Sequence, residues 1–95
     1  MQIKAKKSLG QNFLKSKTAL LAMIKAGEIN SADIVLEIGP GQGALTEKIL
    51  ETGAKVIAVE KDDRLIKVLN EKFEKETRND QFTPYSWRYF GTRFE

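Results

Sequence analysis

A glycine-rich run lies between a short apolar segment and a stretch with helical spacing, and its residue types suit a ligand site. Residues 37–43 read Glu-Ile-Gly-Pro-Gly-Gln-Gly. Glycine allows a tight turn at the end of a strand, and because it has no Cβ it lets a ligand approach the backbone. The helix that follows offers unpaired N–H groups and the positive end of its dipole to a bound group. The run therefore predicts a binding crevice beyond the end of a strand.

An acidic residue, Glu60, follows the next apolar segment, 21 positions after Gly39. In a strand-helix-strand unit it falls at the end of the second strand, where a carboxylate can accept hydrogen bonds from both hydroxyls of a ribose. Each feature alone has an ordinary structural explanation: the glycines could form only a tight connection, and Glu60 could cap a helix or lie in solvent. Together they predict a ligand that contains adenosine.

Two adenosine-containing ligands fit these residues. Gly39, Gly41 and Ala44 satisfy the dinucleotide fingerprint with a small residue at its third position, so NAD is one candidate. Glu37 and Gly43 extend the run to an acidic-x-Gly-x-Gly-x-Gly pattern, which resembles the class I methyltransferases that use S-adenosylmethionine. The glycine run by itself leaves both ligands open.

The elements that must position these residues alternate between helix and strand. Helices are predicted from apolar residues at helical spacing, and strands from dense β-branched and apolar runs of the kind buried on both faces of a sheet. In chain order the predicted elements are a helix at 17–27, a strand at 34–38, a helix at 44–53, a strand at 55–60 and a helix capped by Asp62 or Asp63 that carries Phe73. Strands joined by helical crossovers are parallel, so the predicted fold class is α/β, a Rossmann-like open sheet with right-handed crossover helices.

The last residues do not continue this pattern. After Glu76 the sequence becomes rich in aromatic side chains and Pro84 interrupts any regular element, so neither a helix nor a strand is predicted there. We expect a truncated, two-stranded half-sheet with an exposed edge and unburied apolar faces, which a partner chain could complete. The expected organisation is an N-terminal arm at 1–16, a ligand-binding unit at 17–76 and an aromatic-rich tail at 77–95.

Composition excludes several classes of site. The chain of 95 residues has no cysteine and no histidine, which excludes disulfides, thiol nucleophiles and imidazole chemistry, and we predict no metal site. Its hydrophobic fraction of 41% and charged fraction of 31% are those of an ordinary soluble domain. The longest early apolar run, at 19–24, is too short for a secretory signal or a membrane span, so we expect a cytoplasmic protein with no membrane partner.

Positive charge is concentrated at the N-terminus. The net charge is +3, and the first eighteen residues contain five lysines and no acidic residue. Lysine gives sequence-independent affinity for phosphates, so this arm could contact RNA, or it could be a solvated and frayed terminus. An organelle transit peptide has a similar composition.

Two segments together carry a family resemblance. Residues 6–14 read Lys-Lys-Ser-Leu-Gly-Gln-Asn-Phe-Leu, residues 35–46 read Val-Leu-Glu-Ile-Gly-Pro-Gly-Gln-Gly-Ala-Leu-Thr, and Glu60 follows Val59. With these motifs, residues 5–76 closely resemble the ribosomal RNA adenine dimethyltransferase family. The Gly-Gln-Asn-Phe-Leu segment is highly specific in this combination, and it favours S-adenosylmethionine over NAD as the cofactor.

The resemblance implies transfer of two methyl groups from S-adenosylmethionine to the exocyclic amine of each of two adjacent adenines near the 3′ end of small-subunit ribosomal RNA. It implies that Asn12 and Leu14 flank the methionine portion of the cofactor. It also implies that Gly39 and Gly41 line the cofactor through their backbone and that Glu60 holds its ribose.

The chain departs from the family pattern after residue 76. The family continues with a strand that ends in an acidic residue beside the adenine, and with another strand bearing Asn-Leu-Pro-Tyr or a close variant, and neither motif occurs here. We therefore assign no catalytic residue and expect a cofactor half-site that is catalytically incomplete. Two alternatives remain: a non-catalytic module that holds RNA with its basic arm and aromatic tail, and a remnant that binds NAD.

Overall fold

The computed structural model describes residues 2–7 and 17–89, and the side chains from residue 18 onward. Its elements in chain order are β1 (Gln2–Lys7), α1 (Lys17–Ala26), β2 (Asp33–Ile38), α2 (Ala44–Glu51), β3 (Lys55–Glu60), α3 (Asp63–Lys72), α4 (Glu74–Arg78) and β4 (Phe82–Ser86). The predicted succession of helix, strand, helix, strand and helix is confirmed from α1 to α3, and β3 has the predicted bounds.

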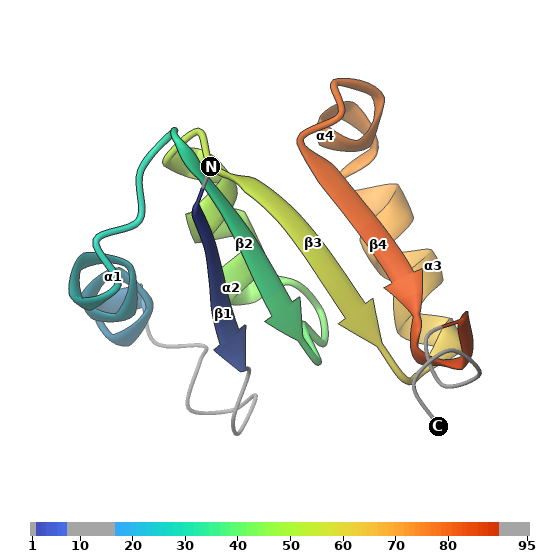
Figure 1. The fold of residues 1–95 in the computed structure, drawn as a ribbon. Coiled ribbons are helices and arrows are strands. Elements are labelled where there is room, and N and C mark those ends of the chain that lie inside the picture. The colour runs from blue at the N-terminus through green and yellow to red at the C-terminus, as the bar shows by residue number, and fades with distance from the viewer. Residues whose placement is uncertain (1, 8–16, 90–95) are drawn as a thin grey trace.

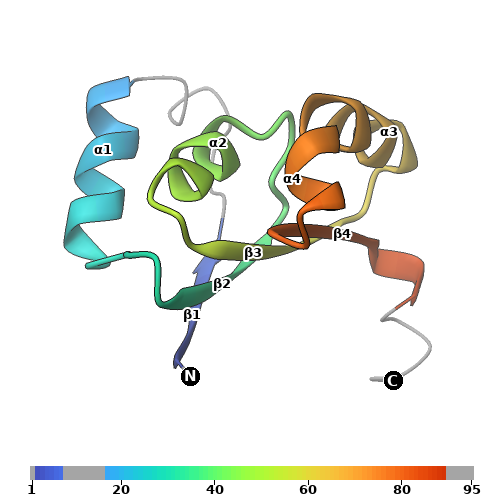
Figure 2. The same ribbon diagram turned by 90° about the horizontal axis from the view of Figure 1, so that it is seen from above.

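The four strands form one parallel sheet in the order β1-β2-β3-β4 (Figure 1). Each crossover moves to the next strand in the same direction, and right-handed crossovers in one direction place their helices on one face of the sheet. Figure 2 shows the labelled helices together on one side of the strands. The predicted open α/β sheet of Rossmann type is confirmed, with four strands in the described residues where two were expected.

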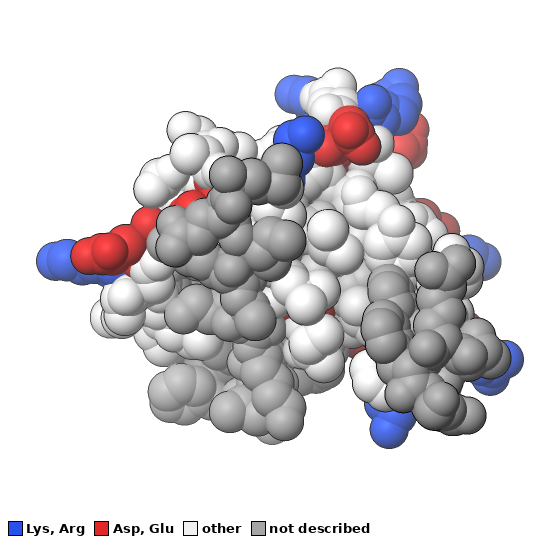
Figure 3. Space-filling view, viewed as in Figure 1, with Lys and Arg blue, Asp and Glu red and all other residues white. Residues whose placement is uncertain are grey.

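The two faces of the sheet differ in burial. On β2, Val35 and Glu37 are fully buried beneath the helices, whereas the alternating residues Ile34, Leu36 and Ile38 are only partly buried. The prediction that this strand is buried on both faces is wrong, because the described helices cover one face alone. Figure 3 looks onto the other face, where the described surface is mostly uncharged and charged side chains lie toward the rim.

The core fills the space between the helices and the covered face of the sheet. Its buried apolar residues are Leu20, Ile29, Val35, Leu45, Ile49, Leu50, Ala54, Val56, Ala58, Leu69, Phe73 and Phe82. Every described helix except the short α4 contributes to the buried cluster or its immediate neighbours. The core therefore fixes α2 and α3 on the two strands whose ends carry the predicted site.

Strand β4 is the main departure from the predicted fold. The side chain of Phe82 is 1% exposed, and its ring centroid lies 5.0 Å from that of Phe73 at the end of α3. Pro84 is tolerated because β4 is an edge strand of the described sheet, where a missing N–H need not remove a ladder hydrogen bond. The prediction of no regular element after Glu76 is therefore wrong, because pairing with β3 and burial of one phenylalanine decide the structure there.

Strand β1 covers the opposite edge of the described sheet. Its backbone pairs in parallel with β2, with Gln2 beside Asp33 and Lys7 beside Ile38. No regular element was predicted for this part of the arm, which reads Gln-Ile-Lys-Ala-Lys-Lys. Backbone pairing satisfies an edge of β2 that would otherwise be open, and it needs little from the side chains.

Candidate functional site

The carboxyl ends of β2 and β3 lie side by side, and the glycine run begins there. Ile38 pairs with Val59 in the sheet, and the N–H of Gly39 donates to the carbonyl of Val59 at 2.8 Å. Parallel strands bring their carboxyl ends to the same edge of a sheet, where open α/β folds bind their ligands. The run at 39–43 therefore crosses directly beside Glu60.

Two glycines of the run serve different purposes. Gly39 has φ +70, and a Cβ built there would meet nothing within 4 Å, so its backbone faces open space. Gly43 has φ +89, and a Cβ there would lie 2.6 Å from Cε2 of Phe73 and 3.1 Å from Cδ2 of Leu69. Gly39 thus leaves room for a ligand, whereas Gly43 allows the start of α2 to pack against α3.

Glu60 lies at the centre of this edge with its carboxylate fixed. The residue is 5% exposed. Its Oε1 accepts a hydrogen bond from the N–H of Gly41 at 3.1 Å, and its Oε2 accepts one from the N–H of Asp62 at 2.9 Å. A carboxylate has about four acceptor positions. Both oxygens are therefore held in place with capacity left for two further donors, such as the hydroxyls of a ribose.

A second buried carboxylate supports the run from behind. Glu37 and Thr46 are both 0% exposed, and Oγ1 of Thr46 donates to Oε1 of Glu37 at 2.5 Å. This hydrogen bond joins β2 to α2 across the base of the glycine run. This contact was not predicted from the sequence, where Glu37 is only the acidic residue of the glycine-rich pattern. The spacing of nine residues gives no local signal, since the contact depends on how α2 folds back over the sheet.

A pocket of about 250 Å³ opens beside Glu60. Its lining consists of Ile38, Gly39, Val59, Glu60, Lys61 and Trp87. The first five residues come from the predicted edge of the sheet. Trp87 comes from the helical turn at 87–89 that follows β4, and its position beside the site was not predicted from the sequence.

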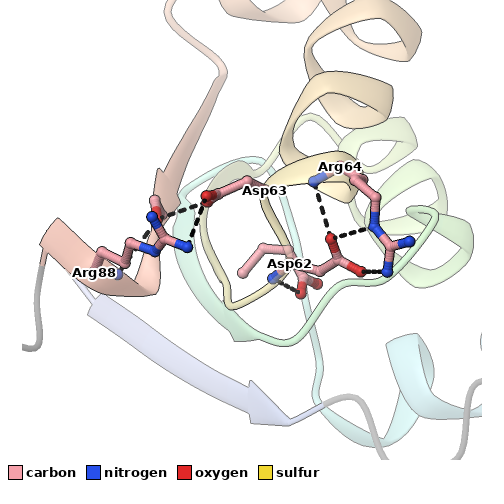
Figure 4. Close-up of polar contacts among 6 residues, drawn as sticks. Asp62, Asp63, Arg64 and Arg88 are labelled. Atoms are coloured by element: carbon pink, nitrogen blue, oxygen red, sulfur yellow. Dashed lines mark hydrogen bonds and ion pairs between the residues drawn. The ribbon is translucent and has the colours of Figure 1, made fainter.

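The start of α3 lies next to this edge and carries two aspartates (Figure 4). Oδ1 of Asp62 accepts from the backbone N–H of Arg64 at 2.9 Å, which confirms Asp62 as the cap of α3. The guanidinium of Arg64 donates to both carboxylate oxygens, from Nε to Oδ1 at 3.1 Å and from Nη2 to Oδ2 at 2.9 Å. These side-chain hydrogen bonds, and then the backbone one, hold the pKa of Asp62 below its ordinary value of 3.8. The same pairing raises the pKa of Arg64.

The predicted site residues divide into two groups. The structure brings Gly39, Gly41 and Glu60 together at one edge of the sheet. The predicted contacts of Asn12 and Leu14 lie outside the described residues. Within the described ranges, no three acidic side chains come close enough together to hold a metal ion. The helices described at 17–78 include none that is long and apolar enough to cross a membrane.

The arrangement fits an adenosine-containing cofactor. The backbone at Gly39 faces open space, a fixed carboxylate has spare acceptors, and a pocket lies between them. The start of α2 faces the same edge. Its N-cap residue, Gly43, has no side chain to bond the first N–H groups of the helix, so these groups can donate to a ligand. Gly39, Gly41 and Glu60 are the described residues that would hold such a cofactor.

Comparison with known proteins identifies the family. A model of the family described as Ribosomal RNA adenine dimethylase matches residues 2–82. The Ribosomal RNA small subunit methyltransferase A of Lactobacillus acidophilus is 48% identical over 84 residues, which cover 84% of this chain and 29% of that protein. The protein of the same name from Lactobacillus helveticus is 51% identical over 77% of this chain and 25% of its own length. That from Levilactobacillus brevis is 54% identical over 70% of this chain and 23% of its own length.

The chain thus spans about a quarter of the length of the curated relatives it matches. The match nevertheless includes all of β2, α2, β3 and α3, which build the glycine run and position Glu60. The chain belongs to the ribosomal RNA adenine dimethylase family.

Proposed function

We propose that this chain binds S-adenosylmethionine at the carboxyl edge of β2 and β3. One observation carries the proposal: the carboxylate of Glu60 is fixed by the N–H of Gly41 beside the open backbone of Gly39, and both Gly39 and Glu60 line the same pocket. A ribose whose hydroxyls donate to Glu60 would lie against that backbone. The family of the chain supports S-adenosylmethionine over NAD as the adenosine-containing ligand.

Each residue has a separate task in this proposal. Glu60 accepts hydrogen bonds from the two ribose hydroxyls, and its own hydrogen bonds to Gly41 and Asp62 keep the carboxylate from turning away. Gly39 and Gly41 present backbone to the cofactor, and at Gly39 a side chain would project into the open space beside the pocket. Asn12 and Leu14, from the arm at 1–16, are proposed to flank the methionine portion. S-adenosylmethionine, when bound, supplies the electrophilic methyl group of its sulfonium.

The reaction of the whole family is a further part of the proposal. The names of the matched relatives describe methylation of small-subunit ribosomal RNA. We propose that this chain supplies the cofactor half of such a site, on the unit at 17–76, and acts in the cytoplasm on ribosomal RNA. The target adenine would be held by residues for which no motif occurs in the tail at 77–95. Methyl transfer would then need groups that residues 1–95 do not provide.

Calorimetric titration of the purified chain with S-adenosylmethionine tests the proposal, with NAD titrated in parallel. Circular dichroism first shows that each sample is folded. We expect saturable binding of S-adenosylmethionine that Glu60→Ala abolishes. Glu71→Ala is the matched control, because it removes an exposed carboxylate from α3 and leaves the pocket untouched.

The outcomes separate the alternatives. NAD that binds as tightly as S-adenosylmethionine would favour a dinucleotide site instead. Absence of binding by a folded chain would reject the proposal. Salt-sensitive binding of single-stranded RNA, without binding of either cofactor, would support the RNA-binding alternative.

A further inference from the structure

Trp87 reaches the proposed cofactor pocket from a part of the chain that carries no motif of the family. Strand β4 pairs in parallel with β3, and Ser86 lies beside Glu60 in the register. Trp87, the first residue after β4, therefore lies at the same carboxyl edge of the sheet as Glu60. Trp87 lines the pocket of about 250 Å³ together with Glu60 and Gly39, and it is 46% exposed.

The side chains on both sides of Trp87, those of Ser86 and Arg88, contact Asp63 at the start of α3 (Figure 4). Oγ of Ser86 donates to Oδ1 of Asp63 at 3.2 Å, and Nη2 of Arg88 lies 3.4 Å from Oδ2 of the same aspartate. The N–H of Arg88 also donates to Oγ of Ser86 at 3.3 Å. One carboxylate thus holds the residues before and after Trp87.

A second contact restrains the same turn. The rings of Tyr85 and Tyr89 stack with centroids 5.7 Å apart and an interplanar angle of 23°. Tyr85 and Tyr89 come before and after Trp87 in the sequence. Their stacking restrains the segment from which Trp87 lines the pocket. A large aromatic ring that is half exposed, on a restrained backbone and beside a fixed carboxylate, is suited to stacking against a flat ligand.

The chemistry of a nucleoside identifies that flat group. A ribose that donates its 2′ and 3′ hydroxyls to Glu60 carries its base on the neighbouring carbon, C1′. The base must then lie in the same pocket, whose other lining side chains are the apolar Ile38 and Val59 and the cation Lys61. We propose that Trp87 forms the wall on which the adenine of the cofactor stacks, an inference that rests on the proposed function.

This wall has a consequence for selectivity. Stacking is tolerant of base identity because every base has a π face, whereas a site that hydrogen-bonds the amine of adenine rejects a base that lacks it. No carboxylate other than that of Glu60 lines the described pocket. The site should therefore bind S-inosylhomocysteine nearly as well as S-adenosylhomocysteine, the compound that remains when the cofactor has given up its methyl group.

The test uses the fluorescence of Trp87, which is the one tryptophan of the chain. The full chain is titrated with S-adenosylhomocysteine while tryptophan emission is recorded, and calorimetry is run on the same samples. We expect an emission change that saturates at the calorimetric Kd. Trp87→Ala should weaken binding roughly five- to hundredfold, the range for loss of one base-aromatic stack. Trp87→Phe should retain most of the affinity.

Leu21→Ala is the matched control, because Leu21 is 49% exposed on α1 and does not line the pocket. It should leave the affinity unchanged. S-inosylhomocysteine should bind within a few-fold of S-adenosylhomocysteine, and a loss of a hundredfold or more would overturn the stacking assignment.

The test separates this inference from the proposed function. Calorimetric binding with unchanged emission, and with equal affinity for Trp87→Ala, would overturn the role of Trp87 and leave the proposed function standing. Absence of calorimetric binding by the folded, unsubstituted chain would overturn both.

Discussion

The backbone N–H of Gly41 donates a hydrogen bond to Oε1 of Glu60 at 3.1 Å, across 19 positions of sequence. This contact links the glycine run after β2 to the end of β3. Because the second carboxylate oxygen is held by the N–H of Asp62, the side chain is oriented before any ligand arrives. The site therefore needs little rearrangement to accept a ribose.

Glu60→Gln tests the charge of that side chain. The amide keeps one acceptor, loses the negative charge and places an NH₂ group where two backbone donors converge. A hydrogen bond to a charged group contributes about 1.5 to 3 kcal/mol, so affinity for S-adenosylmethionine should fall roughly tenfold to hundredfold. Calorimetry measures the change. An affinity equal to that of the unsubstituted chain would show that Glu60 does not hold the ligand.

Gly43→Ala tests the packing behind the glycine run. A Cβ would lie 2.6 Å from Cε2 of Phe73, at a backbone φ of +89 that disfavours alanine. Strain and overpacking together should lower the free energy of unfolding by about 2 to 4 kcal/mol. Urea unfolding followed by circular dichroism gives the value.

Gly39→Ala is the partner experiment, since the two glycines differ in their surroundings. The new Cβ meets nothing within 4 Å, so only the cost of φ +70 remains, about 1 to 2 kcal/mol. The new methyl group instead projects into the space proposed for the ligand. The free energy of binding S-adenosylmethionine should therefore fall by more than the free energy of unfolding. Equal effects of both substitutions on stability would contradict the division of roles.

Thr46→Val removes the donor to buried Glu37 at nearly constant volume. A buried carboxylate oxygen that loses a partner should lower the free energy of unfolding by about 1 to 3 kcal/mol. Thr46→Ser retains the hydroxyl and should recover most of this stability, apart from one lost methyl group. Chemical denaturation of the three proteins side by side measures both effects. Equal stability of the valine and serine variants would show that the hydrogen bond contributes nothing.

Asp62→Asn tests the cap of α3 through pH. The folded-state pKa of Asp62 is depressed below 3.8, so its contribution is present above that value and is lost as the pH falls through the folded-state pKa. Asparagine also caps helices but does not titrate in this range. The loss of stability between neutral pH and about pH 3 should therefore be smaller for the variant. Thermal unfolding at both pH values measures how much stability each protein loses. An equal or larger loss in the variant would contradict the role of the Asp62 carboxylate.

The parts of the fold that the sequence predicted are those with local signals. Strand β3 was predicted with its observed bounds because a β-branched run lies between Gly53 and Asp62. The cap of α3 was narrowed to two residues because aspartate has a short acceptor side chain suited to that position. Gly39, Gly41 and Glu60 were predicted to lie together because their spacing along the chain is itself the signal, and the structure brings them to one edge of the sheet.

The parts that were missed depend on contacts between distant segments. Strand β4 has five residues and a proline, so no period is visible, and burial of Phe82 against Phe73 becomes apparent only in the folded chain. Trp87 enters the pocket through the register of β4 on β3, which no local pattern reports. The prediction that β2 is buried on both faces was wrong, because a run of apolar residues has the same pattern whether helices cover one face of the sheet or both.

Amide chemical-shift mapping of the ¹⁵N-labelled chain during titration with S-adenosylmethionine shows where the cofactor binds. Saturable shifts are expected at Gly39, Gly41 and Lys61, around the carboxyl ends of β2 and β3. No shift is expected at Ala32, which lies in the turn before β2, at the amino end of that strand. Shifts confined to the amino ends of the strands, or none in a folded chain at saturating cofactor, would contradict the assignment of this site.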